Sequence, residues 1–152
     1  MVSTYTPSLL IEEIGTGDQS GTWGDTTNNN FNLFEQAITG FLSKAQGDTA
    51  NLTLTSTNGT LDEARNAVLD LTGALTGARN VIVPTAEKVY LAKNSTSGGF
   101  SLTFKTAAGS GVAVPPGTAR WVYCDGTNVV DGMSGPWTPS SNDSAALGLS
   151  AT

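Results

Sequence analysis

The side chains that could do chemistry in this sequence are mainly carboxylates. It contains 13 Asp and Glu residues and no histidine, so a pair of acids flanking a glycosidic bond is the first arrangement to consider. Asp125 lies in a tight Asp-Gly turn and Asp131 follows a strand-like run, so both have an ordinary structural explanation. Without histidine, the usual general base and transition-metal ligand is missing. We therefore interpret the chain as a non-enzyme that needs no metal and no cofactor.

The other motifs that could carry chemistry also have structural interpretations. Cys124 is the one cysteine, which excludes an internal disulfide and a multi-thiolate zinc site, and its place after an apolar run is typical of a buried small side chain. The Gly-rich stretches at 15–17 and 97–99 lack the Lys-Ser or Lys-Thr pair of a phosphate-binding loop. The stretch 18–25 lacks the alternating ligands of a calcium loop.

Three tryptophans could either stack on sugars or anchor a contact between subunits. Trp is enriched in buried patches between subunits, and its exposed ring faces also bind sugars. We favour core or interface anchors and keep sugar stacking as the alternative. The three residues are Trp23, Trp121 and Trp137.

Composition and charge exclude several classes of partner. The net charge is −6, and the seven Lys and Arg are scattered singly, so we expect no nucleic-acid partner. The longest apolar runs are far shorter than the roughly 20 residues that a membrane span needs, and the first residues lack a signal-peptide pattern. Charged residues make up 13% of the chain, which suits surfaces that other subunits cover.

An extended arm is predicted over residues 1 to about 24. It contains an isolated apolar triplet, followed by a Gly-rich stretch at 15–21 that favours loop structure. Such a triplet has too little partner surface to fold alone, so it either docks on another chain or packs back on its own domain. Its residues are Leu9, Leu10 and Ile11.

One short amphipathic helix is predicted at roughly 27–39. Apolar residues there recur at intervals of three and four, which places them on one face. We expect Asp25 or Thr27 to cap its start and Gly40 to mark its end. The apolar positions are Phe31, Phe34, Ile38, and Phe41 or Leu42.

From about residue 50 onward the apolar rhythm changes to a period of two. Short runs separated by turn residues predict a mainly β fold, an antiparallel β-sandwich of the jelly-roll type. Hairpin turns are expected at 94–99 and 125–128, a Pro-Pro-Gly stop at 115–117, and a short turn before a strand in the segment 60–71. The predicted strands are 52–55, 67–71, 80–83, 88–93, 100–105, 112–114, 119–124 and 128–130.

These elements divide the chain into three parts. Residues 1–45 form the N-terminal attachment arm and short helix, and residues 46–132 form the β-sandwich. Residues 133–152 form a polar C-terminal tail, which we expect to be mobile unless a partner holds it.

Five motifs, taken in order along the chain, suggest a family. They are GTWGDTTNNNF at 21–31, VIVP at 81–84, YLAKN at 90–94, GVAVPPG at 111–117 and VYCDGTN at 122–128. In this order the motifs resemble tail-fibre and other virion structural proteins of marine and freshwater bacteriophages. The resemblance spans most of residues 9–131.

The resemblance implies a β-sandwich head that commonly forms a trimer, preceded by an arm and a helix that attach it to the particle. The chain would then be a tail-associated, fibre-like structural protein of the virion, made in the cytoplasm of the host bacterium. Its partners would be copies of itself and other tail, baseplate or capsid proteins, with no nucleic acid and no membrane insertion.

The partner-binding residues expected under this interpretation act physically rather than chemically. The apolar triplet would insert into a neighbour, a tryptophan would fix the junction, and the apolar helix face would fasten the helix to the sandwich or to sister helices. These residues are Leu9, Leu10 and Ile11, then Trp23, then Phe31, Phe34 and Ile38.

Three further roles stay open. A fibre continues into a long shaft, whereas this sequence ends at Thr152, which favours a tail connector or a capsid decoration (cement) trimer on the phage head. A carbohydrate-binding module for attachment to a host surface glycan is the alternative from another class, and it predicts exposed aromatic side chains in a concave patch.

Overall fold

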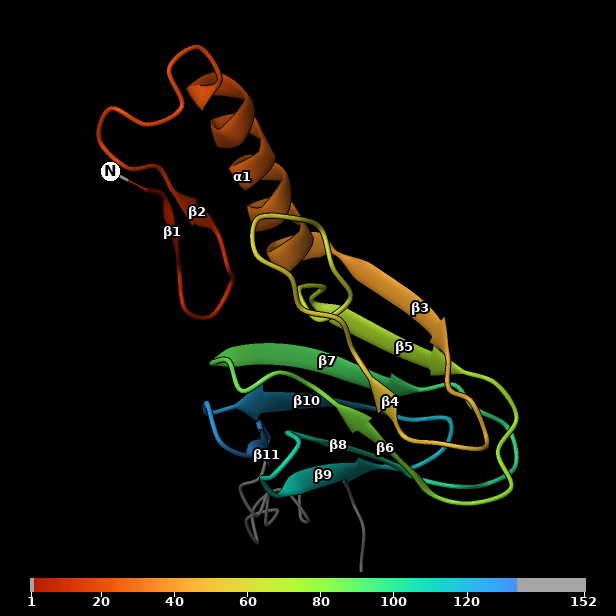
Figure 1. The fold of residues 1–152 in the computed structure, drawn as a ribbon. Coiled ribbons are helices and arrows are strands. Elements are labelled where there is room, and N and C mark those ends of the chain that lie inside the picture. The colour runs from red at the N-terminus through yellow and green to blue at the C-terminus, as the bar shows by residue number, and fades with distance from the viewer. Residues whose placement is uncertain (1, 134–152) are drawn as a thin grey trace, which may run out of the picture.

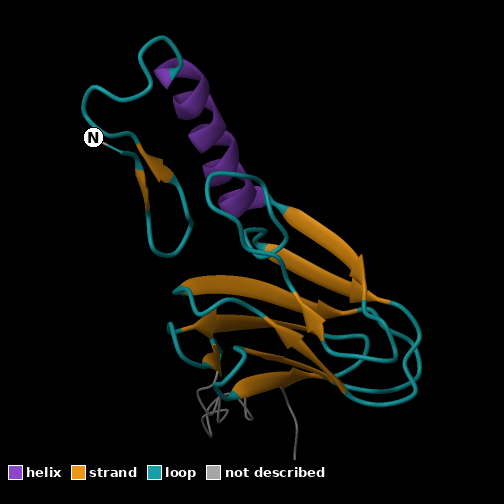
Figure 2. Ribbon diagram, in the orientation of Figure 1, coloured by secondary structure: helices purple, strands orange, loops and turns teal. Residues whose placement is uncertain are grey.

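A computed structural model describes residues 2–133, which form two packed β-sheets with one helix and a small hairpin beside it (Figures 1 and 2). The prediction of a mainly β chain with one amphipathic helix is confirmed. The elements are β1 (Thr4–Tyr5), β2 (Glu12–Glu13), α1 (Trp23–Thr39), β3 (Phe41–Ala45), β4 (Leu52–Thr53), β5 (Val68–Thr72), β6 (Arg79–Ile82), β7 (Lys88–Asn94), β8 (Leu102–Lys105), β9 (Gly111–Val114), β10 (Ala119–Cys124) and β11 (Val129–Asp131).

The two large sheets are built by a chain that winds between them. The five-stranded sheet has the order β11-β10-β7-β5-β3 and the four-stranded sheet the order β4-β6-β8-β9. From β3 to β8, successive strands lie alternately in the two sheets. Each strand from β5 to β8 pairs parallel with the strand two before it in the chain. Beyond β8, the strands β9, β10 and β11 add to the sheets in antiparallel pairs.

The expectation of a purely antiparallel, jelly-roll sandwich is therefore wrong. An apolar period of two indicates that one face of a strand is buried. The same period is found whether the neighbouring strands run parallel or antiparallel, so it does not predict their direction. The direction of pairing depends on whether a turn returns the chain to the same sheet or carries it to the opposite one.

The two predicted hairpin turns illustrate the difference. The turn at 125–128 joins the antiparallel pair β10 and β11 as expected, and the N–H of Asp125 donates to the carbonyl of Asn128 at 3.0 Å. The turn at 94–99 joins β7 and β8, which lie in different sheets, so the predicted hairpin is wrong there.

Asn94 explains how the chain crosses between the sheets at that turn. Its side chain is fully buried, and its amide nitrogen donates to the carbonyls of Phe100 at 3.1 Å and Val114 at 2.9 Å. Its side-chain oxygen accepts the N–H of Thr96 at 3.1 Å. Because one bond reaches Val114 on β9 in the opposite sheet and the other two hold the turn that follows Asn94, the amide fixes the crossover at the edge of the core.

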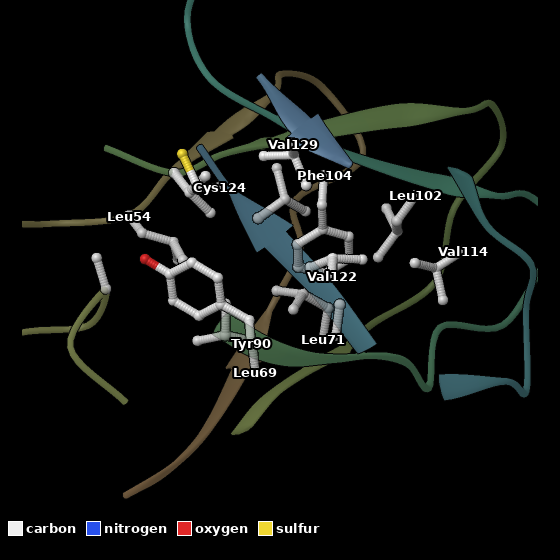
Figure 3. Close-up of a cluster of buried hydrophobic side chains, with 14 of the residues drawn as sticks. Leu54, Leu69, Leu71, Tyr90, Leu102, Phe104, Val114, Val122, Cys124 and Val129 are labelled. Carbon is white, nitrogen blue, oxygen red and sulfur yellow. The ribbon is translucent and has the colours of Figure 1, made fainter. Parts of the chain in front are cut away.

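The core lies between the two sheets and consists of alternate side chains of each strand (Figure 3). Tyr90 and Phe104 are its largest fully buried side chains. Cys124 is fully buried as predicted, and its Sγ lies 3.5 Å from the carbonyl oxygen of Pro84. The other fully buried apolar side chains include Leu69, Leu71, Val81, Leu102 and Val114.

The helix is longer than predicted at its N-terminal end. It begins at Trp23 rather than near residue 27, and the Thr22 side chain at the N-cap makes no capping hydrogen bond to the first turn. The prediction that Asp25 or Thr27 caps the helix is wrong, because both lie inside it. A backbone turn starts the helix instead, since the N–H groups of Thr22 and Trp23 both donate to the carbonyl of Gln19 at 3.0 Å.

The predicted end of the helix at Gly40 is confirmed. A β-carbon at this position would clash with the carbonyl oxygen of Gln36 and with the side chain of Asn66. The carbonyl of Gly40 accepts the N–H groups of Ala67 and Val68, each at 3.0 Å. Glycine therefore lets the end of α1 lie directly against the start of β5.

The sheet structure begins inside the segment expected to be arm and helix. β3 follows Gly40 at once and forms an edge of the five-stranded sheet, and its Phe41 and Leu42 had been grouped with the helix face. The arm is not simply extended, since β1 and β2 pair as a small antiparallel hairpin. The predicted C-terminal tail, 133–152, lies outside the described residues except for Met133, and the interpretation of Trp137 lies outside them as well.

Candidate interaction surface

One face of α1 is attached to the rest of the chain mainly by polar side chains. Asn29 donates to the carbonyl of Gly59 at 2.7 Å, and Gln36 donates to the carbonyl of Asp62 at 2.7 Å. Asn30 exchanges two hydrogen bonds with the backbone of Glu12, at 3.2 and 2.8 Å. Among the described residues of α1, only Leu33 is buried, so apolar packing contributes little to this attachment.

Another side of α1 carries an apolar stripe that is largely exposed to solvent. Since successive helical residues turn by about 100°, its four members fall within roughly 80° of one another. An ordinary surface helix turns such a stripe toward its own core. The stripe comprises Trp23, Phe31, Phe34 and Ile38, which are 63%, 62%, 42% and 74% exposed.

The helix face was expected to fasten α1 either to the sandwich or to sister helices. The exposure of the stripe shows that it does not fasten α1 to the sandwich of its own chain. Trp23 lies at the first residue of α1, at the junction between arm and helix, and its ring too is mostly exposed.

Exposed apolar side chains continue from the helix onto the five-stranded sheet. Phe41 lies three residues beyond the end of the stripe and is 59% exposed. Its neighbour Leu42 packs against the core, and successive side chains of a strand point to opposite faces, so Phe41 points away from the core. The register of the sheet sets one residue from each of four strands side by side on this outer face. This apolar row is Phe41, Val68, Leu91 and Trp121.

Charge is sparse around the stripe and the row. Asp25 and Glu35 are the charged residues within the sequence of α1, and no basic residue is present there. The next row of the sheet contains Asp70 and Lys93, which form an ion pair at 3.0 Å. The surface therefore offers apolar contact with little charge to direct a nucleic acid or a strongly basic partner.

The structure places the apolar triplet of the arm against its own chain. Ile11 is buried, while Leu9 and Leu10 are half-buried. The carbonyl of Leu10 accepts the N–H of Gly59 at 2.9 Å, and the carbonyl of Leu9 accepts the Nε–H of Arg65 at 3.0 Å. Of the two placements left open by the sequence, packing on its own domain is the one seen here.

Arg65 fixes this contact, and sequence reasoning missed it. Its guanidinium forms a buried ion pair with Asp62 at 3.2 Å and donates to the carbonyls of Thr57 and Thr60 as well as Leu9. The segment 60–65 indicated only a turn, since a single Asp-x-x-Arg spacing in a loop is not specific. The burial of the pair depends on the arm tip that closes over it.

Two charged groups near the arm have shifted pKa values. The pKa of Asp18 lies below its ordinary value because its carboxylate accepts the N–H of Gln19 at 2.9 Å and hydrogen bonds from Ser3. Burial, and next the nearby Arg65 charge, lower the pKa of Lys88 to about 8. The Lys88 ammonium lies 4.7 Å from the ring centre of Tyr90.

A shallow hollow lies beside Trp121 at the other end of the apolar row. Its volume is about 330 Å³, and it is lined by Ala119, Arg120, Trp121, Asp131 and Met133. Arg120 and Asp131 form an ion pair at 2.7 Å within it, and the Trp121 side chain is 48% exposed. The hollow thus combines an aromatic face with charged hydrogen-bonding groups.

Comparison with known proteins gives no relative, since no family model, curated protein or solved structure matches the chain. Within residues 2–133, no three of the His, Cys, Asp and Glu side chains come together as a possible metal site. In the same part of the chain, no helix is long and apolar enough to cross a membrane. The side chains of the exposed stripe are left largely unburied by the packing of the described residues.

Proposed function

We propose that the chain is a structural protein of a bacteriophage particle, a tail-associated, fibre-like module that forms a homotrimer and attaches through its N-terminal region. The apolar stripe of α1 carries this proposal. Contiguous exposed apolar surface of this kind marks interaction sites, and a helix held to its own domain by polar side chains leaves the stripe free for a partner. In this role the protein works by assembly and needs no catalytic residue or cofactor.

The N-terminal arm is the element proposed to reach the rest of the particle. Ile11 holds the arm on its own domain, whereas Leu9 and Leu10 at the tip keep part of their surface open to solvent. A neighbouring tail, baseplate or capsid protein would contact that tip. The loss of water from these two side chains would contribute about 1 kcal/mol or more to attachment.

The location and copy number of the chain in purified particles test the proposal. We expect electron microscopy of the phage whose genome encodes the chain to place it at the tail, and quantitative mass spectrometry to give a low copy number. A copy number comparable with that of the major capsid subunit would favour the capsid decoration role instead. Absence from the particle would contradict a structural role in the virion altogether.

A carbohydrate-binding module remains a second candidate because of the hollow at Trp121. An exposed indole face beside a guanidinium and a carboxylate suits the apolar face and hydroxyl groups of a sugar ring. Glycan-array binding that Trp121→Ala abolishes, and that Trp23→Ala leaves intact, would support it. The absence of binding to any glycan would remove this candidate.

A further inference from the structure

We infer that the partner of the apolar stripe is the same stripe of a second copy, with the α1 helices packed in parallel around a rotation axis. The β-sheets of all copies then lie at the same end of the assembly. This inference rests on the proposed function, to which it adds the contacting residues and their orientation.

The spacing along the stripe suits helix-to-helix packing. Phe31, Phe34 and Ile38 follow one another at intervals of three and four residues, as do the seam positions of helices that pack at a small crossing angle, and Phe41 continues the apolar surface onto β3. A helix of 17 residues is about 25 Å long, so one stripe presents several turns of seam to another. Phe34 also borders a hollow of about 310 Å³ between the arm and the helix, where a side chain from a sister helix can insert.

The two ends of α1 differ, and the difference sets the orientation. At its C-terminal end the stripe leads into Phe41 and the apolar row of the sheet, whereas a polar, Gly-rich loop at 14–22 precedes its N-terminal end. Figure 1 shows α1 rising from β3 at one end of the sheets. Parallel packing brings every Phe41 to the axis together and sets the apolar rows of the sheets side by side, whereas antiparallel packing would separate the Phe41 side chains, set each near Trp23 of its neighbour and place the sheets at opposite ends.

The exposed area is sufficient for a stable contact. From their exposed fractions, the stripe and Phe41 together offer on the order of 600 Å² on each copy, and a standard interface buries about 800 Å² per partner. Part of the apolar row would supply the remainder. The stripe itself carries no charge, so identical copies meet without repulsion between its side chains.

Pairing through the open edge of β3 is the other way in which two copies could meet. Lys44 lies in this edge strand and shares the inward face of the strand with Leu42, which packs against the core. The Lys44 ammonium forms an ion pair with Glu63. A charge at such a position disfavours the addition of another strand. The face of α1, rather than the edge of the sheet, is therefore the contact.

Cysteine cross-linking between identical positions tests the orientation. We would make Phe31→Cys and Ile38→Cys as single variants, with Asn32→Cys, an exposed position off the stripe, as the matched control. The native Cys124 is buried, so the wild-type chain serves as the background under mild oxidation. The three substituted side chains are exposed, and circular dichroism checks that each variant keeps the fold.

Parallel packing predicts covalent dimers from both stripe variants and few from Asn32→Cys. In an antiparallel pair that brings the two Phe31 positions together, the Ile38 positions would lie about 20 Å apart, so only one stripe variant would cross-link. That result would overturn the orientation and leave self-association intact. Equal cross-linking of Asn32→Cys would reveal random collision and overturn the inference. A monomer in light scattering, with no cross-link at any position, would contradict both the inference and the proposed trimer.

Discussion

Arg65 ties the arm tip, the loop before β5 and Asp62 together with one buried guanidinium. Its ion pair with Asp62 is almost completely shielded from water, whereas the pair of Arg120 with Asp131 is partly exposed. A buried carboxylate that loses its partner is strongly destabilising, while an exposed pair contributes little. The two pairs provide a matched comparison within one chain.

We expect Arg65→Met to lower the free energy of unfolding by about 3–5 kcal/mol, because Asp62 is left buried and uncompensated. The control Arg120→Met should cost less than about 1 kcal/mol. Urea denaturation followed by tryptophan fluorescence measures both values. Losses of similar size in the two variants would show that Arg65 has no special role in holding the arm tip.

Lys88 should give the fold a distinctive dependence on pH. Its pKa is about 8 in the folded chain, because of burial and the Arg65 charge, against 10.5 for an ordinary lysine. Between these values the unfolded chain binds the extra proton, so stability rises with pH from about 8 to about 10.5. Below pH 8 the lysine is charged in both states, and the whole free-energy cost of burying the charge lowers the stability of the fold.

Replacing this lysine removes the charge and its pH dependence. Lys88→Met should be more stable than the wild type at pH 7, by about 1 kcal/mol because water screens the part of this side chain that stays exposed, and its melting temperature should lack the rise between pH 8 and 10. Lys105→Met, at the end of β8 in the other sheet, is the control and should keep the rise. If the melting temperature of Lys88→Met still rises between pH 8 and 10, a group other than Lys88 causes the pH dependence.

At the scale of elements, α1 has one side made for its own domain and one side made for a partner. Leu33→Ala removes the buried contact and should cost about 2–4 kcal/mol, with faster amide hydrogen exchange throughout α1. Phe31→Ala should change the stability of the isolated chain by less than about 0.5 kcal/mol, since its side chain is mostly exposed. Equal effects would mean that the polar hydrogen bonds alone hold the helix.

The arm hairpin gives a prediction about attachment. Leu9→Ser combined with Leu10→Ser keeps the buried Ile11, so we expect a folded, soluble chain that fails to join particles in a complementation assay. Leu61→Ser, at an exposed apolar residue outside the arm, is the control and should be incorporated as well as the wild type. Normal incorporation of the double variant would rule out the arm tip as the attachment site.

Elements were predictable where a local pattern decides them. The period of two located the strands predicted from 52 to 130 to within two residues at each end, because each strand buries one face. β3 was missed because Phe41 and Leu42 also continue the three-and-four rhythm of the helix. The apolar face of the helix was predicted, but whether this face is turned to the sandwich or to solvent was not. An amphipathic pattern identifies an apolar side of a helix and does not indicate what covers that side.

At the scale of the whole molecule, the path of the chain between sheets could not be predicted. Whether the turn at 94–99 returns β8 to the sheet of β7 depends on hydrogen bonds from Asn94 to Phe100 and Val114, and the last of these partners is distant in sequence. The contact of Arg65 with Leu9 spans 56 residues and leaves no local signal either. Long-range polar contacts of this kind decide the topology.

The proposed trimer requires the stripe to be an interface between copies, and the molar mass in solution tests this most directly. Size-exclusion chromatography with light scattering should give the wild-type chain three times its monomer mass of 15.6 kDa. Phe31→Ser combined with Ile38→Ser should give the monomer mass with an unchanged circular dichroism spectrum, because both side chains are exposed in the single chain. A wild-type chain that stays at 15.6 kDa at every concentration, or a double variant that still forms the trimer, would contradict the account.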